Sequence, residues 1–275
     1  MNYSPKIINN LIETGEIKIK KKFGQNFIID ENIIDSIINK SEIDKNSLII
    51  EIGPGIGALT YKLADFAKNV LCYEIDNSLK EILEDNLKGK PNVNIIYQDF
   101  LKSNIKKDIE KYSYNKISIV ANLPYYITTP IIIKIIEDNL DIAKMIVMVQ
   151  KEVGNRFKAQ PGTKDYGSLS VYLNYYFDVR KLIDVSRNVF IPKPNVDSIV
   201  VEFKKKPILL PLKDKDLFFK LIRDSFKKKR KTIKNNLKEY DLSKIEKTLE
   251  KYNYSLSSRA EELKVEIFVD MANNL

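Results

Sequence analysis

Residues 47–149 alternate short runs rich in isoleucine, valine and leucine with segments of helical character. The apolar runs are SLIIEIG, NVLCYEID, VNIIYQD, KISIVAN and MIVMVQ. Strands that are apolar on both faces are typical of a parallel sheet covered by crossover helices. This alternation predicts a doubly wound α/β fold. We expect two later runs, YYFDVRKLIDVS and DSIVVEFKKK, to extend the same sheet, as an antiparallel hairpin at its edge.

The pattern changes near residue 207. Pro207 and Pro211 interrupt the strands, and beyond them the apolar residues recur at helical spacing. We therefore predict two domains. An α/β domain covers residues 1–206 and begins with an arm at residues 1–22, and a helical domain of three to five helices covers residues 207–275.

The residue composition excludes several kinds of chemistry. The chain has no histidine and a single cysteine, Cys72, which excludes imidazole catalysis and an internal disulfide and predicts no metal site. No apolar run approaches the roughly 20 residues that span a bilayer, and the first residues lack the features of a signal peptide. We therefore expect a cytoplasmic protein without a membrane partner.

Basic residues outnumber acidic ones, with 46 lysines and arginines against 37 aspartates and glutamates, for a formal charge of +9. Such an excess favours a polyanionic partner, although a solvated lysine-rich surface is the alternative. Two basic segments are the candidates for contact with RNA phosphates. They contain Lys21 and Lys22 in the first segment, and Lys228, Lys229, Arg230 and Lys231 in the second.

A glycine-rich loop, EIGPGIG, joins the first strand of the pattern to a helix. Glycines at such a turn let the backbone approach a ligand and aim the N-terminus of the helix at it. A tight turn without a ligand is the alternative. Gly53, Gly55 and Ala58 also match the dinucleotide-binding pattern G-x-G-x-x-G/A, so this loop alone leaves a nicotinamide dehydrogenase open.

A polar residue stands at the end of each of the first four strands. These residues are Glu51, Glu74, Asp99 and Asn122, at spacings of 23, 25 and 23. The carboxyl ends of parallel strands meet at one edge of a sheet, where ligands bind. Each acid alone is a candidate helix cap. Two carboxylates in register, however, suit the ribose diol, exocyclic amine and positive charge of S-adenosylmethionine, which we favour over a nicotinamide cofactor.

The fourth strand ends in the motif Asn122-Leu123-Pro124-Tyr125. The side-chain oxygen of Asn122 and the main-chain carbonyl of Leu123 suit the two N–H groups of an exocyclic adenine amine. Pro124 fixes the backbone, and Tyr125 suits stacking on the purine. A methylated amine loses its proton to water, so this chemistry needs no histidine. We predict that these four residues are catalytic, with an ordinary strand-exit turn as the alternative.

In this order, the motifs resemble those of the ribosomal RNA adenine dimethyltransferases, and most of all the small-subunit branch of the KsgA type. The resemblance runs almost end to end, through KKFGQNFI, EIGPGIGALT, NLPYYITTPI, MVQKEVGNRFKAQPGTKDYGSLSV, FIPKPNVDS, KKKRKTIKNNL and SRAEEL. It implies a Rossmann-like class I S-adenosylmethionine-dependent methyltransferase domain with a mostly parallel seven-stranded sheet. A small C-terminal all-helical domain that contacts RNA would follow it.

The resemblance also assigns roles to single residues. A segment that carries Asn26 and Ile28 would close over the cofactor, with Ile28 in the place of the usual leucine. Glu74 would bind the ribose hydroxyls, and Asp99 the adenine amine. The implied cofactor contacts are Asn26, Ile28, Gly53, Gly55, Glu74, Ile75, Asp99, Phe100 and Asn122.

By the same resemblance, the chain would dimethylate N6 of two adjacent adenosines in the 3′-terminal hairpin loop of small-subunit (16S) rRNA and so contribute to small-subunit biogenesis. It would act as a monomer on a partly assembled 30S-type subunit. Phe190 would hold the flipped adenine against Tyr125, although a phenylalanine of the core is the alternative. Two other functions stay open. They are a large-subunit (23S) methyltransferase of the macrolide-resistance type, which usually has isoleucine in place of Leu123, and a non-catalytic RNA-binding or transcription factor.

Overall fold

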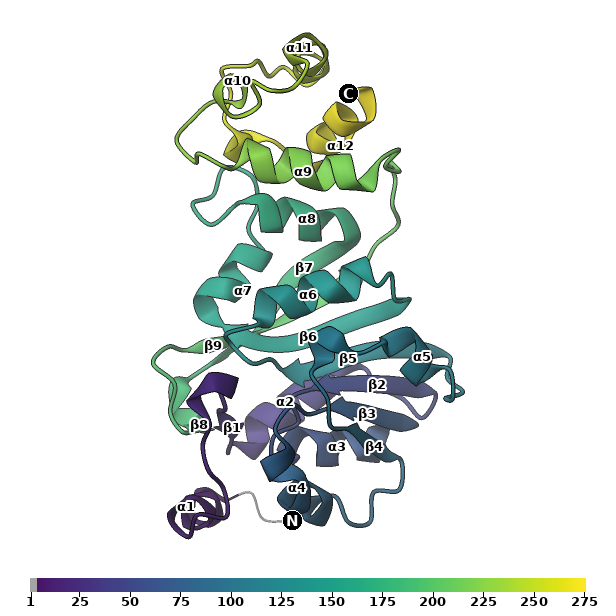
Figure 1. Cartoon of the computed structure of the whole chain (residues 1–275), viewed down its shortest axis with the longest axis vertical. Coiled ribbons are helices and arrows are strands. Elements are labelled where there is room, and N and C mark those ends of the chain that lie inside the picture. Colours follow the sequence, from purple (N-terminus) through teal and green to yellow (C-terminus); the bar gives the residue numbers. More distant parts are fainter. Residues whose placement is uncertain (1–3) are drawn as a thin grey trace. The chain divides into compact units, whose positions relative to one another are not determined.

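Seven strands form the central sheet of the computed structural model, which describes residues 4–275 (Figure 1). Their order is β4-β3-β2-β5-β6-β9-β7. Strand β3 pairs in parallel with β4 and β2, and β5 pairs in parallel with β2 and β6. The bounds are β2 Ser47–Ile52, β3 Asn69–Tyr73, β4 Val93–Ile96, β5 Lys116–Asn122, β6 Ile142–Gln150, β7 Phe177–Val185 and β9 Ser198–Lys205. The predicted α/β fold with a mostly parallel, seven-stranded sheet is confirmed.

The apolar runs of the sequence become the buried centre of this sheet. Every residue of β2 is buried, because β2 lies inside the sheet and helices cover it. Ile49 packs in one cluster with Leu63 of α3 (Ala58–Phe66) and Ile37 of α2 (Glu31–Ser41). Burial of an isoleucine or leucine side chain contributes about 1.5–3 kcal/mol, so this cluster holds the strand ends in fixed positions.

Short helices connect the strands. Several begin at an aspartate or asparagine whose side chain accepts backbone N–H groups, as Asp30 does at the start of α2. The other helices of this part are α1 Pro5–Glu13, α4 Lys80–Asn86, α5 Ile105–Ile109 and α6 Thr128–Glu137, with 3-10 turns at Lys21–Phe23, Asn77–Leu79, Phe100–Lys102 and Arg187–Val189. Residues 1–3 of the predicted N-terminal arm, and the side chain of Lys21, lie outside the described part of the chain.

A second, two-stranded sheet joins distant parts of the chain. Strand β1 (Phe27–Ile28) pairs antiparallel with β8 (Phe190–Ile191), so that Ile28 stands opposite Phe190. Phe27 packs in a small buried cluster with Ile8 and Ile17. The N-terminal segment is therefore attached to the α/β fold by both main-chain bonds and apolar contacts.

The chain forms two compact units. The first contains the residues up to Lys151 together with Lys181–Phe203, and the second contains Glu152–Arg180 and Lys204–Leu275. The division near residue 204 lies close to the predicted boundary at 206/207. Residues 152–180, however, group with the C-terminal helices rather than with the predicted α/β domain. The physical reason is that the helix at residues 168–176 packs into the hydrophobic core of the C-terminal helices.

Helix α8 (Ser168–Tyr176) contributes Val171 and Tyr175 to a buried cluster with Phe218 and Phe268. The ring of Tyr175 lies 5.3 Å from that of Phe218, measured between centroids. The helices of this unit are α7 Lys151–Phe157, α8, α9 Lys215–Ser225, α10 Ile233–Asn236, α11 Leu242–Glu250 and α12 Val265–Asn274, with a 3-10 turn at Ala260–Glu262.

Within residues 4–275, none of the helices is both long and apolar enough to cross a bilayer. The same residues contain no group of three or more cysteine, aspartate or glutamate side chains placed to hold a metal ion.

Candidate functional site

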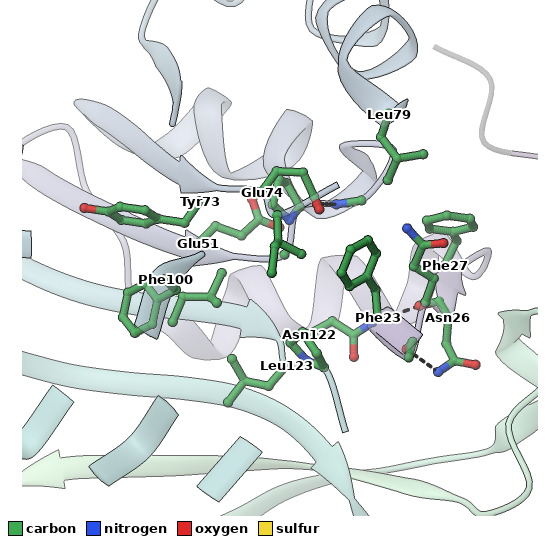
Figure 2. A pocket seen from close by; sticks show the side chains of 18 of the residues that line it. Phe23, Asn26, Phe27, Glu51, Tyr73, Glu74, Leu79, Phe100, Asn122 and Leu123 are labelled. Carbon is green, nitrogen blue, oxygen red and sulfur yellow. Dashed lines mark hydrogen bonds between the residues drawn. The ribbon is translucent and has the colours of Figure 1, made fainter. Parts of the chain in front are cut away.

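A cleft lies at the carboxyl ends of strands β2, β3, β4 and β5 (Figure 2). It encloses about 900 Å³ of space, part of it open to solvent. All nine predicted cofactor residues line it, and so do the three predicted catalytic residues that follow Asn122. These residues are Asn26, Ile28, Gly53, Gly55, Glu74, Ile75, Asp99, Phe100 and Asn122, followed by Leu123, Pro124 and Tyr125.

The glycine-rich loop after β2 requires glycine at two positions. Gly55 has φ +61°, and a Cβ atom there would lie 3.0 Å from two atoms of the Phe27 ring. Gly57 has φ +88°, and its Cβ would lie 2.9 Å from Leu83 Cδ1. Both the left-handed backbone and the close neighbours therefore exclude a side chain. The loop brings its main-chain N–H groups to the edge of the cleft.

Glu74 is held rigidly beside this loop. Its side chain is 4% exposed and accepts hydrogen bonds from the N–H groups of Gly55, at 3.1 Å, and Asp76, at 2.8 Å. Burial raises the pKa of Glu74, and these two hydrogen bonds oppose that rise. A carboxylate has about four acceptor positions, so two bonds leave capacity for hydroxyl donors.

Glu51 is a cleft residue that the sequence analysis did not assign to the site. Its carboxyl is 2% exposed, and burial raises its pKa to about 8. The nearby charge of Glu74 adds to this rise, whereas the hydrogen bond that Cys72 Sγ donates to Glu51 Oε2 opposes it. Glu51 therefore retains its proton near neutral pH. The signal for it was present in the sequence, since Glu51 begins the regular series of polar residues at the strand ends.

Other cleft residues were missed for a different reason. Phe23, Gln25 and Tyr126 line the cleft beside predicted residues. Figure 2 shows the ring of Phe23 projecting into the space between Asn122 and Glu74. They lie within the motifs KKFGQNFI and NLPYYITTPI, but they carry no spacing that would single them out from their neighbours.

Asp99 and Phe100 follow β4. One oxygen of Asp99 accepts the N–H of Leu101, at 3.0 Å, and so caps a 3-10 turn while the residue lines the cleft. Phe100 is 3% exposed and stands edge-to-face with Tyr73, with 5.2 Å between ring centroids. Asp99 thus combines the helix-cap role considered from the sequence with a position at the ligand edge.

Asn122, the last residue of β5, has a fixed amide. Its Nδ2 donates to the main-chain oxygen of Asn26, at 3.1 Å, which settles which end of the amide is nitrogen. Its Oδ1 is buried and accepts no hydrogen bond from the residues that the structure describes. An unpaired buried acceptor costs about 1–3 kcal/mol. The site therefore holds an acceptor that a ligand N–H group is suited to satisfy.

The residues after Asn122 form a tight turn into α6. The carbonyl of Pro124 accepts bonds from Ile127 N, at 3.2 Å, and Thr128 Oγ1, at 3.0 Å. The hydroxyl of Tyr125 lies 2.6 Å from Ser198 Oγ, and burial raises its pKa. Tyr125 is half-buried, so its ring is held in place while part of it faces the cleft.

The structure does not bring Phe190 into the cleft. Phe190 is 2% exposed and packs in the core cluster that also contains Ile28 and Val200. A purine stacks only on an open ring face, and the ring of Phe190 is covered here. This arrangement matches the alternative of a core phenylalanine, and the stacking role stays a prediction.

The basic run in the second unit lies on an exposed turn between α9 and α10. Lys228, Lys229, Arg230 and Lys231 are all exposed. The side chain of Asn236 holds this turn by donating to the main-chain oxygens of Ser225, Lys228 and Lys231, at 2.7, 3.2 and 3.4 Å. The side-chain nitrogen of Asn236 therefore stabilises the turn that carries the basic residues.

Comparison with known proteins gives consistent results. A family model described as ribosomal RNA adenine dimethylase matches residues 16–275. The ribosomal RNA small subunit methyltransferase A of Macrococcus caseolyticus is 44% identical over 283 residues, which cover 99% of this chain and 95% of the relative.

Two solved structures are also similar. A dimethyladenosine transferase from Plasmodium falciparum has a TM-score of 0.76 at 25% identity, over 89% of this chain and 95% of that one. The 23S rRNA methyltransferase ErmE has a TM-score of 0.68 at 25% identity, over 90% of this chain and 99% of that one. With the family model spanning both units and every residue of the cleft, the chain belongs to the ribosomal RNA adenine dimethylase family.

Proposed function

We propose that the protein transfers methyl groups from S-adenosylmethionine to N6 of adenosines in small-subunit rRNA. The observation that carries this proposal is the unpaired Oδ1 of Asn122, held at the end of β5 by the bond from its Nδ2 to Asn26. An adenine amine supplies the N–H donor that this oxygen lacks. The name of the Macrococcus relative, at 44% identity, supports the small subunit as the source of the RNA.

The cleft residues fit S-adenosylmethionine. Glu74 would accept hydrogen bonds from the ribose hydroxyls through its remaining lone pairs. Asp99 would accept a hydrogen bond from the amine of the cofactor's own adenine. Gly53 and Gly55 leave room for the methionine portion, while Ile28, Ile75 and Phe100 supply apolar contacts. When bound, the sulfonium group supplies an electrophilic methyl carbon.

The chain's own residues prepare the adenine for attack. The amine of adenine is a poor nucleophile, because its lone pair is delocalised into the ring. Hydrogen bonds to Asn122 Oδ1 and the Leu123 carbonyl would hold the two N–H groups and stabilise the positive charge that develops on N6. Stacking on Tyr125 would fix the ring plane, so that most of the acceleration comes from alignment. The proton of the methylated amine goes to water.

The proposed target is a pair of adjacent adenosines in the 3′-terminal hairpin loop, each converted to N6,N6-dimethyladenosine. Bases of a loop are unstacked at less cost than those of a duplex and present their edges to a protein. The protein would act as a monomer in the cytoplasm, on a partly assembled 30S-type subunit. Lys22 and the exposed basic turn at Lys228, Lys229, Arg230 and Lys231 would contact RNA phosphates, as would Lys21.

Large-subunit RNA is the second candidate substrate, because the fold of ErmE, a 23S rRNA methyltransferase, is also similar. One experiment separates the two. The purified protein is incubated with methyl-labelled S-adenosylmethionine and either 30S-type or 50S-type particles from cells that lack it, and rRNA fragments are analysed by mass spectrometry. We expect two dimethyladenosines in the 30S-type RNA. Label in 50S-type RNA alone would contradict the small-subunit proposal, and no label in either RNA would contradict methyl transfer itself.

A further inference from the structure

One wall of the cleft is a continuous stretch of chain, from Phe23 to Ile28. Its C-terminal end is attached through the pairing of β1 with β8. Its N-terminal half belongs to no strand and follows directly on a 3-10 turn at Lys21–Phe23. A single turn of this kind is not stable by itself, so the N-terminal half of the wall needs another anchor.

That anchor is Asp76, a carboxylate that is 1% exposed. Lys20 Nζ lies 2.5 Å from its Oδ1, and Gln25 Nε2 donates to its Oδ2 at 2.7 Å. Gln25 Oε1 in turn accepts the main-chain N–H of Lys20, at 2.8 Å. These three bonds form a closed ring that holds residues 20 and 25 against the loop after β3.

Both carboxylate oxygens of Asp76 accept hydrogen bonds. Burial opposes ionisation, but hydrogen bonds from Lys20, Ser78 and Gln25 outweigh it and lower the pKa of Asp76. Lys20 Nζ also donates to Ser78 Oγ, at 2.8 Å. Hydrogen bonds between charged partners are roughly twice as strong as neutral ones. The Lys20 side chain is 34% exposed, but removing it would leave the buried carboxylate of Asp76 without its cation.

Asp76 is also hydrogen-bonded to Glu74, the carboxylate proposed to bind the cofactor's ribose. Its main-chain N–H donates to Glu74 Oε1 at 2.8 Å, and Glu74 Oε2 accepts the N–H of Gly55 at 3.1 Å. The anchor of the cleft wall and the carboxylate proposed for the ribose therefore share one hydrogen-bonded loop. Lys20 is connected to Glu74 by two hydrogen bonds, one from its Nζ to the Asp76 carboxylate and one from the Asp76 main-chain N–H.

We propose that Lys20 and Asp76 are positioning residues that latch residues 20–28 over the cofactor cleft and so determine how tightly S-adenosylmethionine is held. This rests on the proposed function. It also separates Lys20 from its neighbour Lys22, whose side chain is exposed and lies 4.7 Å from the Phe23 ring centroid. Lys20 serves the cofactor side, and Lys22 remains a candidate for RNA.

Calorimetric binding of S-adenosylhomocysteine to the full chain tests the latch. We expect D76N and K20M each to weaken binding by about tenfold or more, and K20R to restore it to within about threefold of the unchanged protein. The matched control is Lys88→Met, which removes an exposed lysine paired with Asp85. It should not change binding. In kinetics, D76N and K20M should raise KM for S-adenosylmethionine far more than they lower kcat.

Two further measurements make the outcome decisive. Without any ligand, amide hydrogen exchange over residues 20–28 should accelerate in K20M and D76N and stay unchanged in Lys88→Met. The salt dependence of RNA binding should fall in K22Q but not in K20M. Unchanged affinity and unchanged exchange in K20M would overturn the latch, even if D76N fails to fold. If the unaltered chain does not bind S-adenosylhomocysteine, the proposed function fails, and the exchange data still decide whether Lys20 anchors the wall.

Discussion

The side-chain nitrogen of Asn122 is bonded to the main-chain oxygen of Asn26, 96 residues earlier in the chain, at 3.1 Å. This bond joins the motif proposed for the target base to the segment proposed to cover the cofactor. It also sets the orientation of the amide, because the nitrogen must face the carbonyl and the oxygen must point the other way. One contact therefore orients groups from both halves of the site.

Asn122→Ala should lower kcat about 100- to 1,000-fold, because it removes an acceptor aimed at developing charge. RNA affinity should change little, since phosphate contacts dominate it. Steady-state methylation and filter binding measure the two effects. Asn115→Ala, at an exposed asparagine of the same unit, is the control and should leave both unchanged. Turnover within tenfold of the original in Asn122→Ala would refute the assigned role.

Gly55→Ala should destabilise the fold by about 1–3 kcal/mol and weaken cofactor binding. The new methyl group would lie 3.0 Å from the Phe27 ring, at a backbone φ of +61°. Gly89→Ala is a close control, since its φ is +84° and nothing lies within 4 Å of an added Cβ. It therefore reports backbone strain alone. Urea unfolding of both variants isolates the clash with Phe27, and equal losses in the two would mean that the clash is absent.

Glu51→Gln should change how stability depends on pH. Burial raises the pKa of Glu51 from its ordinary 4.5 to about 8, so between these values the folded chain keeps a proton that the unfolded chain has lost. This group therefore makes the free energy of unfolding fall as pH rises, by at most about 1.4 kcal/mol per pH unit. The glutamine variant lacks this contribution. Urea unfolding from pH 5 to 8 should show the variant gaining stability relative to the original chain as pH rises. A constant difference would show that the pKa is not raised.

Replacing Lys228, Lys229 and Arg230 by glutamine should weaken RNA binding and reduce the salt slope by about two, if all three contact phosphates of single-stranded RNA. Replacing the exposed Lys106, Lys107 and Lys111 removes the same charge from another surface. The slopes of the two triple variants, measured between low and moderate salt, separate local contact from net charge. Equal slopes in the two would show that the basic turn does not touch phosphate.

The sheet and the cleft were predictable because their signals are local and periodic. Runs such as SLIIEIG are apolar on both faces, as expected of a strand buried inside a parallel sheet. The polar residue that ends each run lies at the carboxyl end of its strand, which is the edge of a parallel sheet where ligands bind. Glu74, Asp99 and Asn122 therefore come together in the structure as the spacing indicates.

Features that depend on distant pairing were not predictable in the same way. The pairing of Ile28 with Phe190 joins strands of two residues each, which are too short to show a period of two. That pairing buries Phe190, a placement that the motif alone left open. Helix α8 likewise joins the helical core through Val171 and Tyr175, whose spacing is compatible with packing on either unit.

The division of the chain has a consequence for synthesis on the ribosome. Strand β9 lies between β6 and β7 in the sheet, yet it is the last of the three to be made. Until residues 198–205 emerge, β6 lacks its outer neighbour and presents an unpaired edge, which is a hazard for aggregation. The first unit therefore stays incomplete during synthesis, even after residues 152–180 of the second unit have left the ribosomal exit tunnel. The first unit is made from two separate stretches of the chain, with part of the second unit between them.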